Sequence, residues 1–372
     1  MKKKYRKIKQ RKFNKNRYKR KKFLSIKIFL FHKWLKLVIV ILLIFILFII
    51  TLIKKRKINN NVHIAINMDI KYIYPFIVYL TSLLDNKNAS SFYTVHILTN
   101  KKTIYQSKDI INKVIKKFEN NSIKIKYYNL EGEFQGATVG KFSLIAYYRI
   151  SLPSILYNID KVIYTDIDMI NFKDLSEMYN IKFNDNMYIC AQLDYTFLIE
   201  ELKEFGINTN KYINGGIIIF NLKEMRNKGI ENKMREFATT HKLKTYDQTA
   251  INAICYNNTQ ILPFKYGMFA FDSINELIKL NNEQNIMYRF NESELIQAFN
   301  EPTLFHYCAW SKPWSKSSKN FNRIYWWYYA KMSGFYSEIL DYYGFEKKYV
   351  EDLLKKIPED GGLLRRTYKK LA

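Results

Sequence analysis

The stretch Tyr164–Ile170 reads Y-T-D-I-D-M-I and decides how the chain is organised. Asp166 and Asp168 stand two residues apart at the end of an apolar run that starts at Val162. Side chains alternate between the two faces of a strand, so both carboxylates project to the same side. Two convergent carboxylates at the end of a buried strand suit a hard divalent cation with a phosphate beyond it. Our first hypothesis is therefore the metal site of an enzyme that uses a nucleotide-activated substrate.

The acid-x-acid spacing alone is a weak signal. With 33 acidic residues in a chain of 372, about three such pairs are expected by chance. The pairs that occur are Asp166/Asp168, Glu131/Glu133 and Glu292/Glu294. Any one of them can also be interpreted as a solvated strand edge or loop. The surrounding elements must therefore distinguish the first pair from the other two.

Apolar runs and amphipathic segments alternate before the first pair. Three strand–helix repeats lead into it, and they predict a mostly parallel sheet with right-handed crossovers. Ligands bind beyond the carboxyl ends of the strands in such sheets, and Asp166 and Asp168 lie at one of these ends. We expect strands at residues 62–66, 92–98, 123–128 and 161–165, and helices at 72–84, 104–118 and 142–156.

The pattern continues with strands at 187–193 and 212–222 and helices at 223–239 and 246–254. The segment Tyr212–Gly216 has two glycines, which would let the backbone approach a ligand closely, although an ordinary turn explains them equally well. A strand within 303–314 carries His306, and a short loop then presents Lys312 between aromatic residues. Taken singly, these two side chains are also consistent with a satisfied polar residue and a surface lysine.

The tail from Phe321 is aromatic and basic, with two amphipathic helices expected up to about Ile357. We favour cover of the hydrophobic core as its role, with contact to a membrane surface as the alternative. The three cysteines, Cys190, Cys255 and Cys308, are too few for a disulfide framework, and no C-x-x-C pattern indicates zinc.

Most of the positive charge lies near the N-terminus. The net charge is +28; residues 1–36 hold 17 Lys and Arg, residues 54–57 hold four more, and no acid precedes Asp69. Removing these 21 charges leaves +7 for the rest of the chain. We therefore expect no specific nucleic-acid partner for the globular part. The basic tail itself is expected to be disordered or to lie on an anionic membrane, with an RNA-binding arm as the alternative.

Residues 37–53 contain no charge and would form a helix about 26 Å long, enough to cross a membrane. No small-x-small cleavage site follows, so we expect an uncleaved signal anchor, followed by a linker at 54–61. The positive excess before the helix places the tail at 1–36 in the cytosol. The expected protein is single-pass, in a Golgi-type membrane if eukaryotic and in the cell membrane if bacterial.

Six segments, in this order, resemble glycosyltransferase family 8, the retaining nucleotide-sugar transferases that include glycogenin and bacterial lipopolysaccharide galactosyl- and glucosyltransferases. The resemblance runs from Val62 to about Lys331. It implies one α/β catalytic domain at 62–314, of the GT-A, Rossmann-like type with a mixed, mostly parallel sheet, and a helical extension at 315–372. The segments are D-I-K-Y (69–72), Y-Y-R-I-S-L-P (147–153), L-Y-N-I-D-K-V-I-Y-T-D-I-D (156–168), Y-I-N-G-G (212–216), Y-D-Q (246–248) and H-Y-C…K-P-W (306–314).

The resemblance also implies a role for each matching residue. Asp166, Asp168 and His306 would bind a divalent cation, Mn²⁺ in preference to Mg²⁺ because imidazole is a softer donor. Lys312 would be a second counter-charge on the donor diphosphate. The remaining roles are Tyr72 on the uracil, Asp69 near the nucleoside, Arg149 on the donor phosphate or sugar, and Asn214, Asp194, Asp247 and Gln248 in the sugar and acceptor pocket.

One departure from the family pattern concerns the first loop, where the family often has two adjacent acids. Here Asp69 is followed by Ile70 and Lys71, which affects the expected base and ribose contacts but not the metal site. The family retains the anomeric configuration, and no carboxylate nucleophile is evident from the sequence. We expect an oxocarbenium-like transition state, with the diphosphate accepting the proton and Gln248 stabilising the sugar.

The resulting hypothesis is a membrane-anchored, metal-dependent hexosyltransferase. It would move glucose or galactose from a UDP-hexose to a glycan, a lipid-linked glycan or a protein. Two alternatives come from other classes. A nucleotidyltransferase also uses paired carboxylates on such a sheet, but it leaves the H-Y-C…K-P-W segment unexplained. A membrane-tethered nucleotide-sugar-binding protein without transferase activity would have no need for Asp166, Asp168, His306 and Lys312 together.

Overall fold

The computed structural model describes most of the chain after residue 60 and one helix before it. Two compact units are formed, Met1–Asn59 and Asn60–Ala372. Most of the expected basic tail and linker lie outside the described residues. The described residues are 33–50, 61–118, 122–139, 143–194, 199–209, 211–269, 271, 273–283, 290–308, 312–358 and 363.

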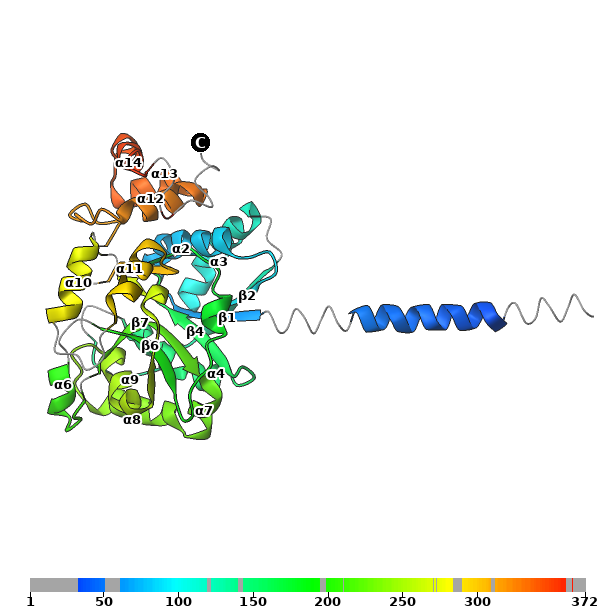
Figure 1. The fold of residues 1–372 in the computed structure, drawn as a ribbon, viewed down its shortest axis with the longest axis horizontal. Helices are drawn as coiled ribbons and strands as arrows, with labels where there is room; N and C mark the ends of the chain where they lie inside the picture. Colours follow the sequence, from blue (N-terminus) through cyan, green and yellow to red (C-terminus); the bar gives the residue numbers. More distant parts are fainter. Residues whose placement is uncertain are drawn as a thin grey trace, which may run out of the picture. The chain divides into compact units, whose positions relative to one another are not determined.

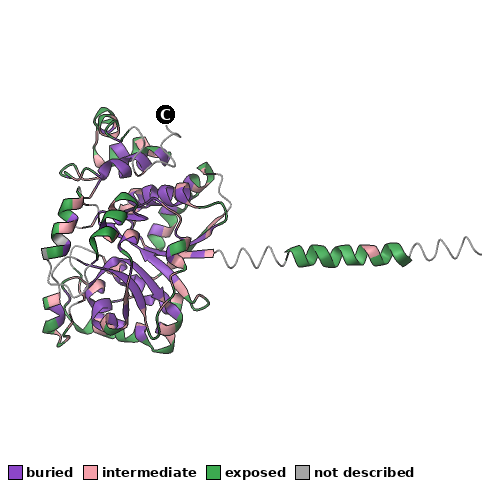
Figure 2. Ribbon diagram, in the orientation of Figure 1, coloured by how far each residue is buried: buried purple, intermediate pink, exposed green. Residues whose placement is uncertain are grey.

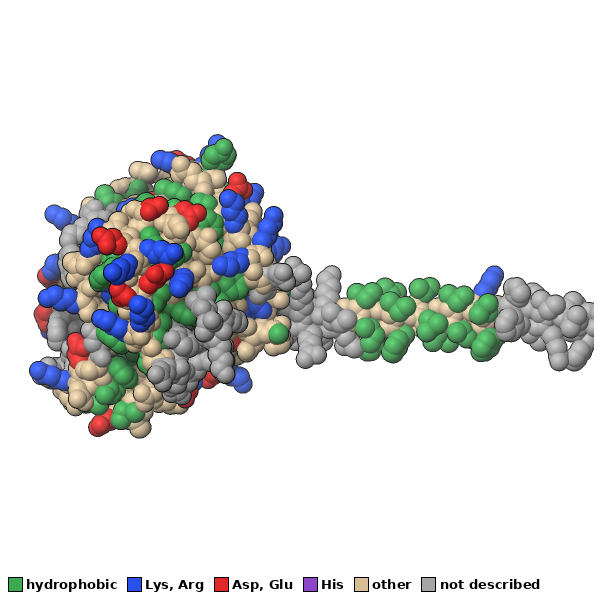
Figure 3. Space-filling view, turned by 90° about the horizontal axis from the view of Figure 1, so that it is seen from above, with side chains coloured by type: hydrophobic (Ala, Val, Ile, Leu, Met, Phe, Trp, Pro, Cys, Tyr) green, Lys and Arg blue, Asp and Glu red, His purple; other side chains and the backbone are tan. Residues whose placement is uncertain are grey.

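The N-terminal unit contains one described helix, Lys33–Ile50. Its 18 residues have a mean hydropathy of 2.8, and none of its surface is buried (Figure 2). Hydrophobic side chains cover it along its length in Figure 3. By length and composition it could cross a membrane, although a signal sequence would meet the same criteria. It starts four residues before the expected span of 37–53, whose last three residues are outside the described part.

The larger unit is built on a seven-stranded sheet with the order β3-β2-β1-β4-β7-β6-β8 (Figure 1). Strand β7 is antiparallel to both of its neighbours, and the other four pairings in this sheet are parallel. The α/β class with a mixed, mostly parallel sheet is therefore confirmed. The strands are β1 (Asn61–Asn67), β2 (Phe92–Thr99), β3 (Ile123–Asn129), β4 (Lys161–Thr165), β6 (Ile189–Leu193), β7 (Ile213–Asn221) and β8 (Thr259–Ile261).

Helices cover both faces of this sheet because alternate strand residues point to opposite sides. On one face, Ile64, Val95 and Ile163 pack with α2 (Ile73–Asn86) and α3 (Lys101–Lys117). The opposite face, which includes Ala65, Val162 and Ile218, packs against a second group of helices. That group consists of the 3-10 helix η2 (Leu144–Ser151), α4 (Leu152–Ile155), α7 (Leu222–Asn227), α8 (Ile230–Thr240) and α9 (Asp247–Cys255).

A three-stranded sheet stands beside the large one, with the order β5-β10-β9. Strand β5 (Met169–Asn171) directly follows the two acidic residues, and β10 (Leu304–His306) pairs with it antiparallel, His306 opposite Met169. The third strand, β9 (Met268–Phe269), is parallel to β10. The pairing brings His306 beside Asp168, and Tyr307 N–H donates to Asp168 O at 2.9 Å.

The C-terminal helices cover apolar surface of the small sheet and of α2. Helix α12 (Arg323–Met332) buries Trp326 and Trp327 completely, in a cluster that includes Phe172 and Phe305. Asn86 at the end of α2 donates to the Tyr329 hydroxyl at 2.7 Å. This packing agrees with the favoured interpretation of the tail as core cover. The remaining helices are η1 (Ile70–Tyr72), α5 (Ser176–Tyr179), α6 (Ile199–Glu204), η3 (Tyr256–Asn258), η4 (Phe264–Tyr266), α10 (Ile274–Glu283), α11 (Glu292–Asn300), α13 (Tyr336–Tyr343) and α14 (Lys347–Leu354).

Two of the expected helices are wrong in detail. The segment expected as one helix over 142–156 forms the 3-10 helix η2 and then the short α4, because Pro153 lacks an N–H and fits only the first turn of a new helix. The helix expected over 223–239 is divided into α7 and α8. Gly229 separates them with a φ of 61°, a left-handed conformation that glycine adopts readily.

A chain of side-chain hydrogen bonds runs across the strands β1, β2 and β3. Asn61 Nδ2 donates to His63 Nε2 (3.2 Å), which leaves His63 Nδ1–H to donate to His96 Nε2 (3.0 Å) and His96 Nδ1–H to donate to the Tyr128 hydroxyl (2.9 Å). Burial, with a smaller effect of Lys126, lowers the pKa of His63 to about 4. Burial, His63 and Lys126 lower the pKa of His96 to about 3. Both imidazoles are therefore neutral at physiological pH.

We expect this chain to make stability fall as the pH drops. The unfolded histidines take up protons near pH 6.5, whereas the folded ones resist protonation until about pH 4 and pH 3. The contribution of the two neutral histidines to the free energy of unfolding is therefore complete above about pH 6.5 and decreases as the pH falls from 6.5 toward 4 and 3. Urea unfolding, followed by tryptophan fluorescence, should show a loss of about 3–4 kcal/mol between pH 7 and pH 5.

The double variant His63→Gln/His96→Gln separates this effect from that of the carboxylates. It should lose most of the pH dependence in this range, while the exposed control His241→Gln should keep it. An unchanged slope in the double variant would contradict the assignment.

Candidate active site

A cavity of about 500 Å³ lies at the carboxyl ends of β1 and β4. The strand order reverses between these two strands, since the chain leaves β1 toward β2 on one side and β4 lies on the other. This is the topological switch point at which α/β sheets bind ligands. The structure brings ten of the expected site residues to this cavity: Asp69, Tyr72, Arg149, Asp166, Asp168, Asp194, Asn214, Asp247, Gln248 and Lys312.

His306 is the one expected residue that does not line the cavity; it is buried directly behind Asp168. Ligand atoms of Asp166, Asp168 and His306 lie within 4.8 Å of one another, and within the described part of the chain this is the one such group of three. Asp168 Oδ1 lies 3.3 Å from His306 Nε2, and the buried His306 Nδ1 has no hydrogen-bond partner among the described residues. Two carboxylates and an imidazole with an unused donor atom fit a divalent cation.

Lys312 lies at the edge of this cluster. Its ammonium group pairs with Asp168 Oδ2 and donates to Tyr307 O at 2.9 Å. Burial opposes ionisation of Asp168, but Lys312 and His306 outweigh it and hold the pKa of this carboxyl well below its usual range. Burial likewise opposes the charge on Lys312, and Asp168 raises its pKa. Both groups are therefore charged at neutral pH.

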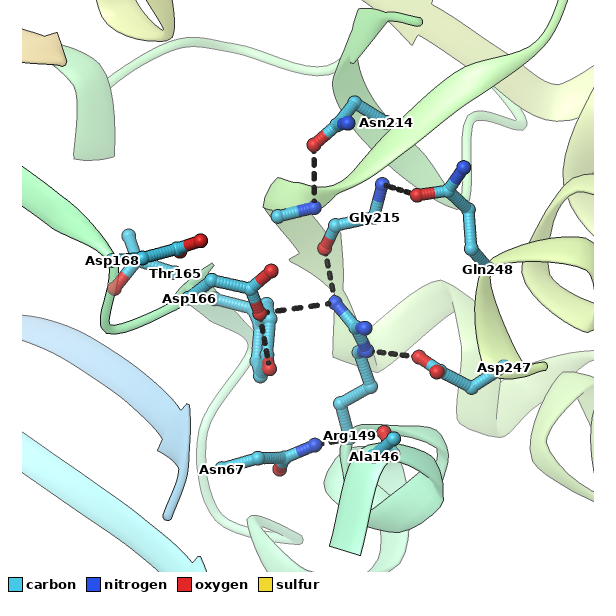
Figure 4. Close-up of polar contacts among 12 residues, drawn as sticks. Asn67, Ala146, Arg149, Thr165, Asp166, Asp168, Asn214, Gly215, Asp247 and Gln248 are labelled. Atoms are coloured by element: carbon cyan, nitrogen blue, oxygen red, sulfur yellow. Dashed lines mark hydrogen bonds and ion pairs between the residues drawn. The ribbon is translucent and has the colours of Figure 1, made fainter. Parts of the chain in front are cut away.

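Arg149 is a buried cation that joins two carboxylates (Figure 4). Its Nε pairs with Asp247, and one terminal nitrogen donates to Gly215 O and lies 3.6 Å from Asp166 Oδ1. The guanidinium also stacks over the Tyr164 ring at 4.5 Å, whose hydroxyl donates to Asp166 at 2.9 Å. Burial would lower the pKa of Arg149, but Asp247 and its other neighbours raise it. Arg149 therefore orients both carboxylates, and its expected contact with the donor stays a prediction.

Asp247 is nearly fully buried, with 3% of its surface exposed. Burial raises its pKa to about 6, although Arg149 opposes the shift, so the carboxylate is still ionised at neutral pH. Tyr246, immediately before it, has a φ of 55° and a ψ of −126°. This backbone conformation is rare outside glycine and costs on the order of 1–3 kcal/mol. The strained residue lies at the cavity wall, at the turn that delivers Asp247 and Gln248.

The side chains of Asn214, Gln248 and Asp194 form one hydrogen-bonded wall of the cavity. Gln248 Oε1 accepts from Gly215 N–H at 2.7 Å, and its Nε2 donates to Asp194 Oδ2 at 2.9 Å. Asn214 Nδ2 donates to the same Asp194 oxygen at 3.2 Å, and its Oδ1 accepts from Gly216 N–H at 2.8 Å. Both amides are therefore fixed in orientation.

The two glycines of β7 have a packing role that the sequence did not indicate. A Cβ on Gly216 would lie 2.3 Å from His306 Cε1, and a Cβ on Gly215 would lie 3.2 Å from both Arg149 and Gln248. The groups that approach the backbone of these glycines are therefore side chains of the protein, whereas the sequence suggested a ligand. Gly216 leaves the space in which His306 reaches the two aspartates.

Asp69 and Tyr72, which also line the cavity, belong to the turn that follows β1. Asp69 Oδ1 accepts from Lys71 N–H at 3.2 Å and caps the 3-10 helix η1. Sequence reasoning gave no role to several cavity residues. Tyr164, Tyr246, Cys308 and Trp314 stood within quoted segments and could have been found there, whereas nothing in the pattern singled out Asn67.

The sequence model of glycosyl transferase family 8 matches residues 63–318. General stress protein A of Bacillus subtilis is 29% identical over 182 residues, which span 47% of this chain and 60% of that protein. A putative glycosyltransferase of Haemophilus influenzae is 26% identical, over 68% of this chain and 72% of its own length. Lipopolysaccharide 1,2-glucosyltransferase of Escherichia coli is 24% identical, over 68% of this chain and 73% of its own length.

Solved structures share the fold. The bifunctional glycosyltransferase WbbM has a TM-score of 0.63 at 18% identity, over 76% of this chain and 52% of its own. The galactosyltransferase LgtC, solved with donor and acceptor sugar analogues, has a TM-score of 0.58 at 18% identity, over 73% of this chain and 95% of its own. These likenesses confirm a GT-A-type architecture for the larger unit.

The substitution Gly216→Ala tests the packing of His306. The added methyl group collides with the imidazole, so His306 must move away from the aspartates. We expect Mn²⁺ affinity, measured by titration calorimetry, to fall about 10- to 100-fold. Gly215→Ala is the comparison variant, because its methyl group touches Arg149 and Gln248 and not His306; it reaches Asp166 only through Arg149, so it should lower the affinity less than Gly216→Ala does. Equal affinities of Gly216→Ala and the unmutated protein would contradict this geometry.

Proposed function

Since the chain belongs to glycosyltransferase family 8 and is a hexosyltransferase, we propose that it transfers glucose or galactose from a UDP-hexose with retention of configuration. The acceptor is a glycan, a lipid-linked glycan or a protein, and the reaction depends on a divalent cation. The observation that carries this proposal is the cluster of Asp166, Asp168 and His306 beside Lys312, at the switch point of the sheet.

The charges around the cavity support a cation. Five carboxylates line it, those of Asp69, Asp166, Asp168, Asp194 and Asp247, together with four cations, Lys71, Arg149, Lys244 and Lys312. With all of them ionised the lining has an excess of one negative charge, so a cation is favoured over an anion. A donor diphosphate would be repelled by the carboxylates alone, so binding of the donor and of the cation should be coupled.

Asp166, Asp168 and His306 would hold the cation, and Mn²⁺ suits their mixed oxygen and nitrogen donors better than Mg²⁺ does. When bound there, the cation supplies Lewis-acid neutralisation of the charge that develops on the departing diphosphate. Lys312, which is charged and partly accessible at the cavity edge, adds a second counter-charge for the same oxygens.

The fixed amide wall supports a stabilising role for Gln248. Its carbonyl oxygen already accepts a hydrogen bond and its nitrogen donates to Asp194, so the side chain is oriented but not basic. Asp247 is held by Arg149 and is nearly fully buried, which argues against its acting as a nucleophile. An oxocarbenium-like transition state fits this wall, with the acceptor hydroxyl attacking on the face that the diphosphate leaves and giving its proton to the diphosphate.

Tyr72 and Asp69 would contact the uracil and the nucleoside in the cavity. Arg149 would reach the donor with the edge of its guanidinium that lines the cavity. Asn214, Asp194 and Asp247 would receive the hexose hydroxyls, since buried polar groups that pair with a substrate discriminate strongly between sugars.

The decisive experiment follows UDP release from UDP-glucose or UDP-galactose with Mn²⁺. Asp168→Asn should lower turnover at least about 100-fold, because it removes a charged cation ligand. Glu292→Gln is the matched control, because Glu292 belongs to a second acid-x-acid pair, is exposed at the start of α11 and does not line the cavity; it should have unaltered turnover. Turnover that survives Asp168→Asn unchanged would contradict the metal assignment.

The same assay separates the alternatives. Formation of UTP and hexose 1-phosphate from the UDP-hexose and added inorganic diphosphate, in place of UDP, would favour a nucleotidyltransferase. Binding of UDP-sugar without any release of UDP, with every acceptor offered, would favour a tethered binding protein.

We propose that the helix Lys33–Ile50 anchors the enzyme in a membrane, with the basic tail at 1–36 on the cytosolic side. The full chain should then stay with the membrane pellet during alkaline carbonate extraction. A chain that lacks residues 1–53 should move to the supernatant, as judged by immunoblot. Release of the full chain into the supernatant would show that the helix does not span the membrane.

A further inference from the structure

Trp314 lines the same cavity as Tyr72, although the two residues come from distant parts of the chain. It follows Lys312 by two residues, in the K-P-W segment, and it is half-buried. Lys312 reaches Asp168 at the cation cluster. Trp314 therefore lies close in sequence to the residue that we propose as a counter-charge for the diphosphate, and its neighbours in the fold indicate which part of the donor it meets.

The C-terminal helices hold Trp314 from behind. Its ring centroid lies 5.4 Å from that of Trp326 on α12 and 6.2 Å from that of Tyr343 on α13. Trp327 Nε1–H donates to Pro313 O at 3.1 Å, which fixes the backbone immediately before it. Three aromatic side chains thus position a fourth one at the cavity wall.

Helix α13 also reaches the turn that carries Tyr72. The Tyr342 hydroxyl donates to Lys71 O at 3.4 Å, and its ring lies 5.0 Å from the ring of Tyr74. Burial first, and then the phenols of Tyr342, Tyr72 and Tyr74, raise the pKa of Tyr343, so these four rings share one region. The same helix therefore supports Trp314 and the Tyr72 turn.

We propose that Trp314 is a second aromatic binding residue for the nucleoside of the donor, beside Tyr72, and that Tyr343 is its positioning residue. This inference rests on the proposed function, because it takes the ligand to be a nucleoside diphosphate. A flat, apolar base suits a wall that two aromatic side chains form, since every base presents a π-face for stacking. Stacking contacts depend little on which base is bound, so Trp314 should increase the affinity for the nucleotide more than it discriminates between bases.

The arrangement gives the C-terminal helices a part in donor binding. Trp326 and Trp327 are fully buried and contribute no surface to the cavity. Their contacts with Trp314 and Pro313 nevertheless hold in place the part of the cavity wall that Trp314 forms. The extension therefore acts on the donor through Trp314, in addition to covering the core.

The test compares UDP with inorganic diphosphate as ligands of the full chain in detergent, by titration calorimetry with Mn²⁺ present. Trp314→Ala should weaken UDP binding about tenfold or more, because it removes a base contact. It should leave diphosphate binding unchanged, since Lys312 and the cation cluster are intact. Trp314→Phe keeps an aromatic face and should bind UDP within about threefold of the unmutated protein.

Two further variants complete the design. Tyr343→Leu should weaken UDP binding less than Trp314→Ala does, again without affecting diphosphate. Phe321→Ala removes an aromatic residue that is 48% exposed and lies outside the cavity lining, and it should change neither ligand. Thermal unfolding of each variant accompanies the titrations.

The outcomes separate this inference from the proposed function. Equal UDP affinity of Trp314→Ala and the unmutated protein would overturn the role of Trp314 while leaving a UDP-dependent transferase intact. An equal loss of UDP and diphosphate binding would also overturn it, since that result indicates a general disturbance of the site. Failure of the unmutated protein to bind UDP would instead count against the proposed donor.

Discussion

The antiparallel pairing of β5 with β10 is the contact on which the functional site depends. It joins the strand that follows the acidic pair to the strand that ends in His306. The backbone hydrogen bond from Tyr307 N–H to Asp168 O then fixes the position of the His306 imidazole relative to the Asp168 carboxylate. Without this pairing, Lys312 would lose Asp168 as well, because its loop begins a few residues beyond the strand. One short sheet thus determines the geometry of both the cation cluster and its counter-charge.

A buried cation keeps the acidic side of the cavity ionised. Arg149 contacts Asp166, which borders the cavity, and Asp247, which is nearly fully buried. An unpaired carboxylate in such surroundings would take up a proton, since burial disfavours its charged form. Removing Arg149 would therefore change the charge of the pocket as well as its shape. A lysine could not replace it, because the planar guanidinium serves a carboxylate, a carbonyl and an aromatic ring at once.

The main features of the fold and much of the site were predictable from the sequence, because both follow from local patterns. Period-two apolar runs predicted the strands of the parallel half, and the position of Asp166 and Asp168 at a strand end predicted where a ligand would meet them. The Gly215–Gly216 packing was not predictable, because its cause is the approach of His306 and Arg149 from other elements. The division at Gly229 was missed because apolar spacing continues across it. The hydrogen-bonded pair His63–His96 depends on strand register, which no single strand reveals.

The packing of α12 on α2 has a consequence for the order in which the chain folds. Asn86 and Tyr329 are 243 residues apart, so the apolar surface that α12 covers stays open until nearly the whole polypeptide has been made. Contacts between such distant segments form slowly, and surface left open in the meantime is prone to aggregation. The early strands and their helices can pair locally while the ribosome is still at work. Synthesis of the last fifty residues is then the step that closes the core, and a truncated chain would be a substrate for chaperones and proteases.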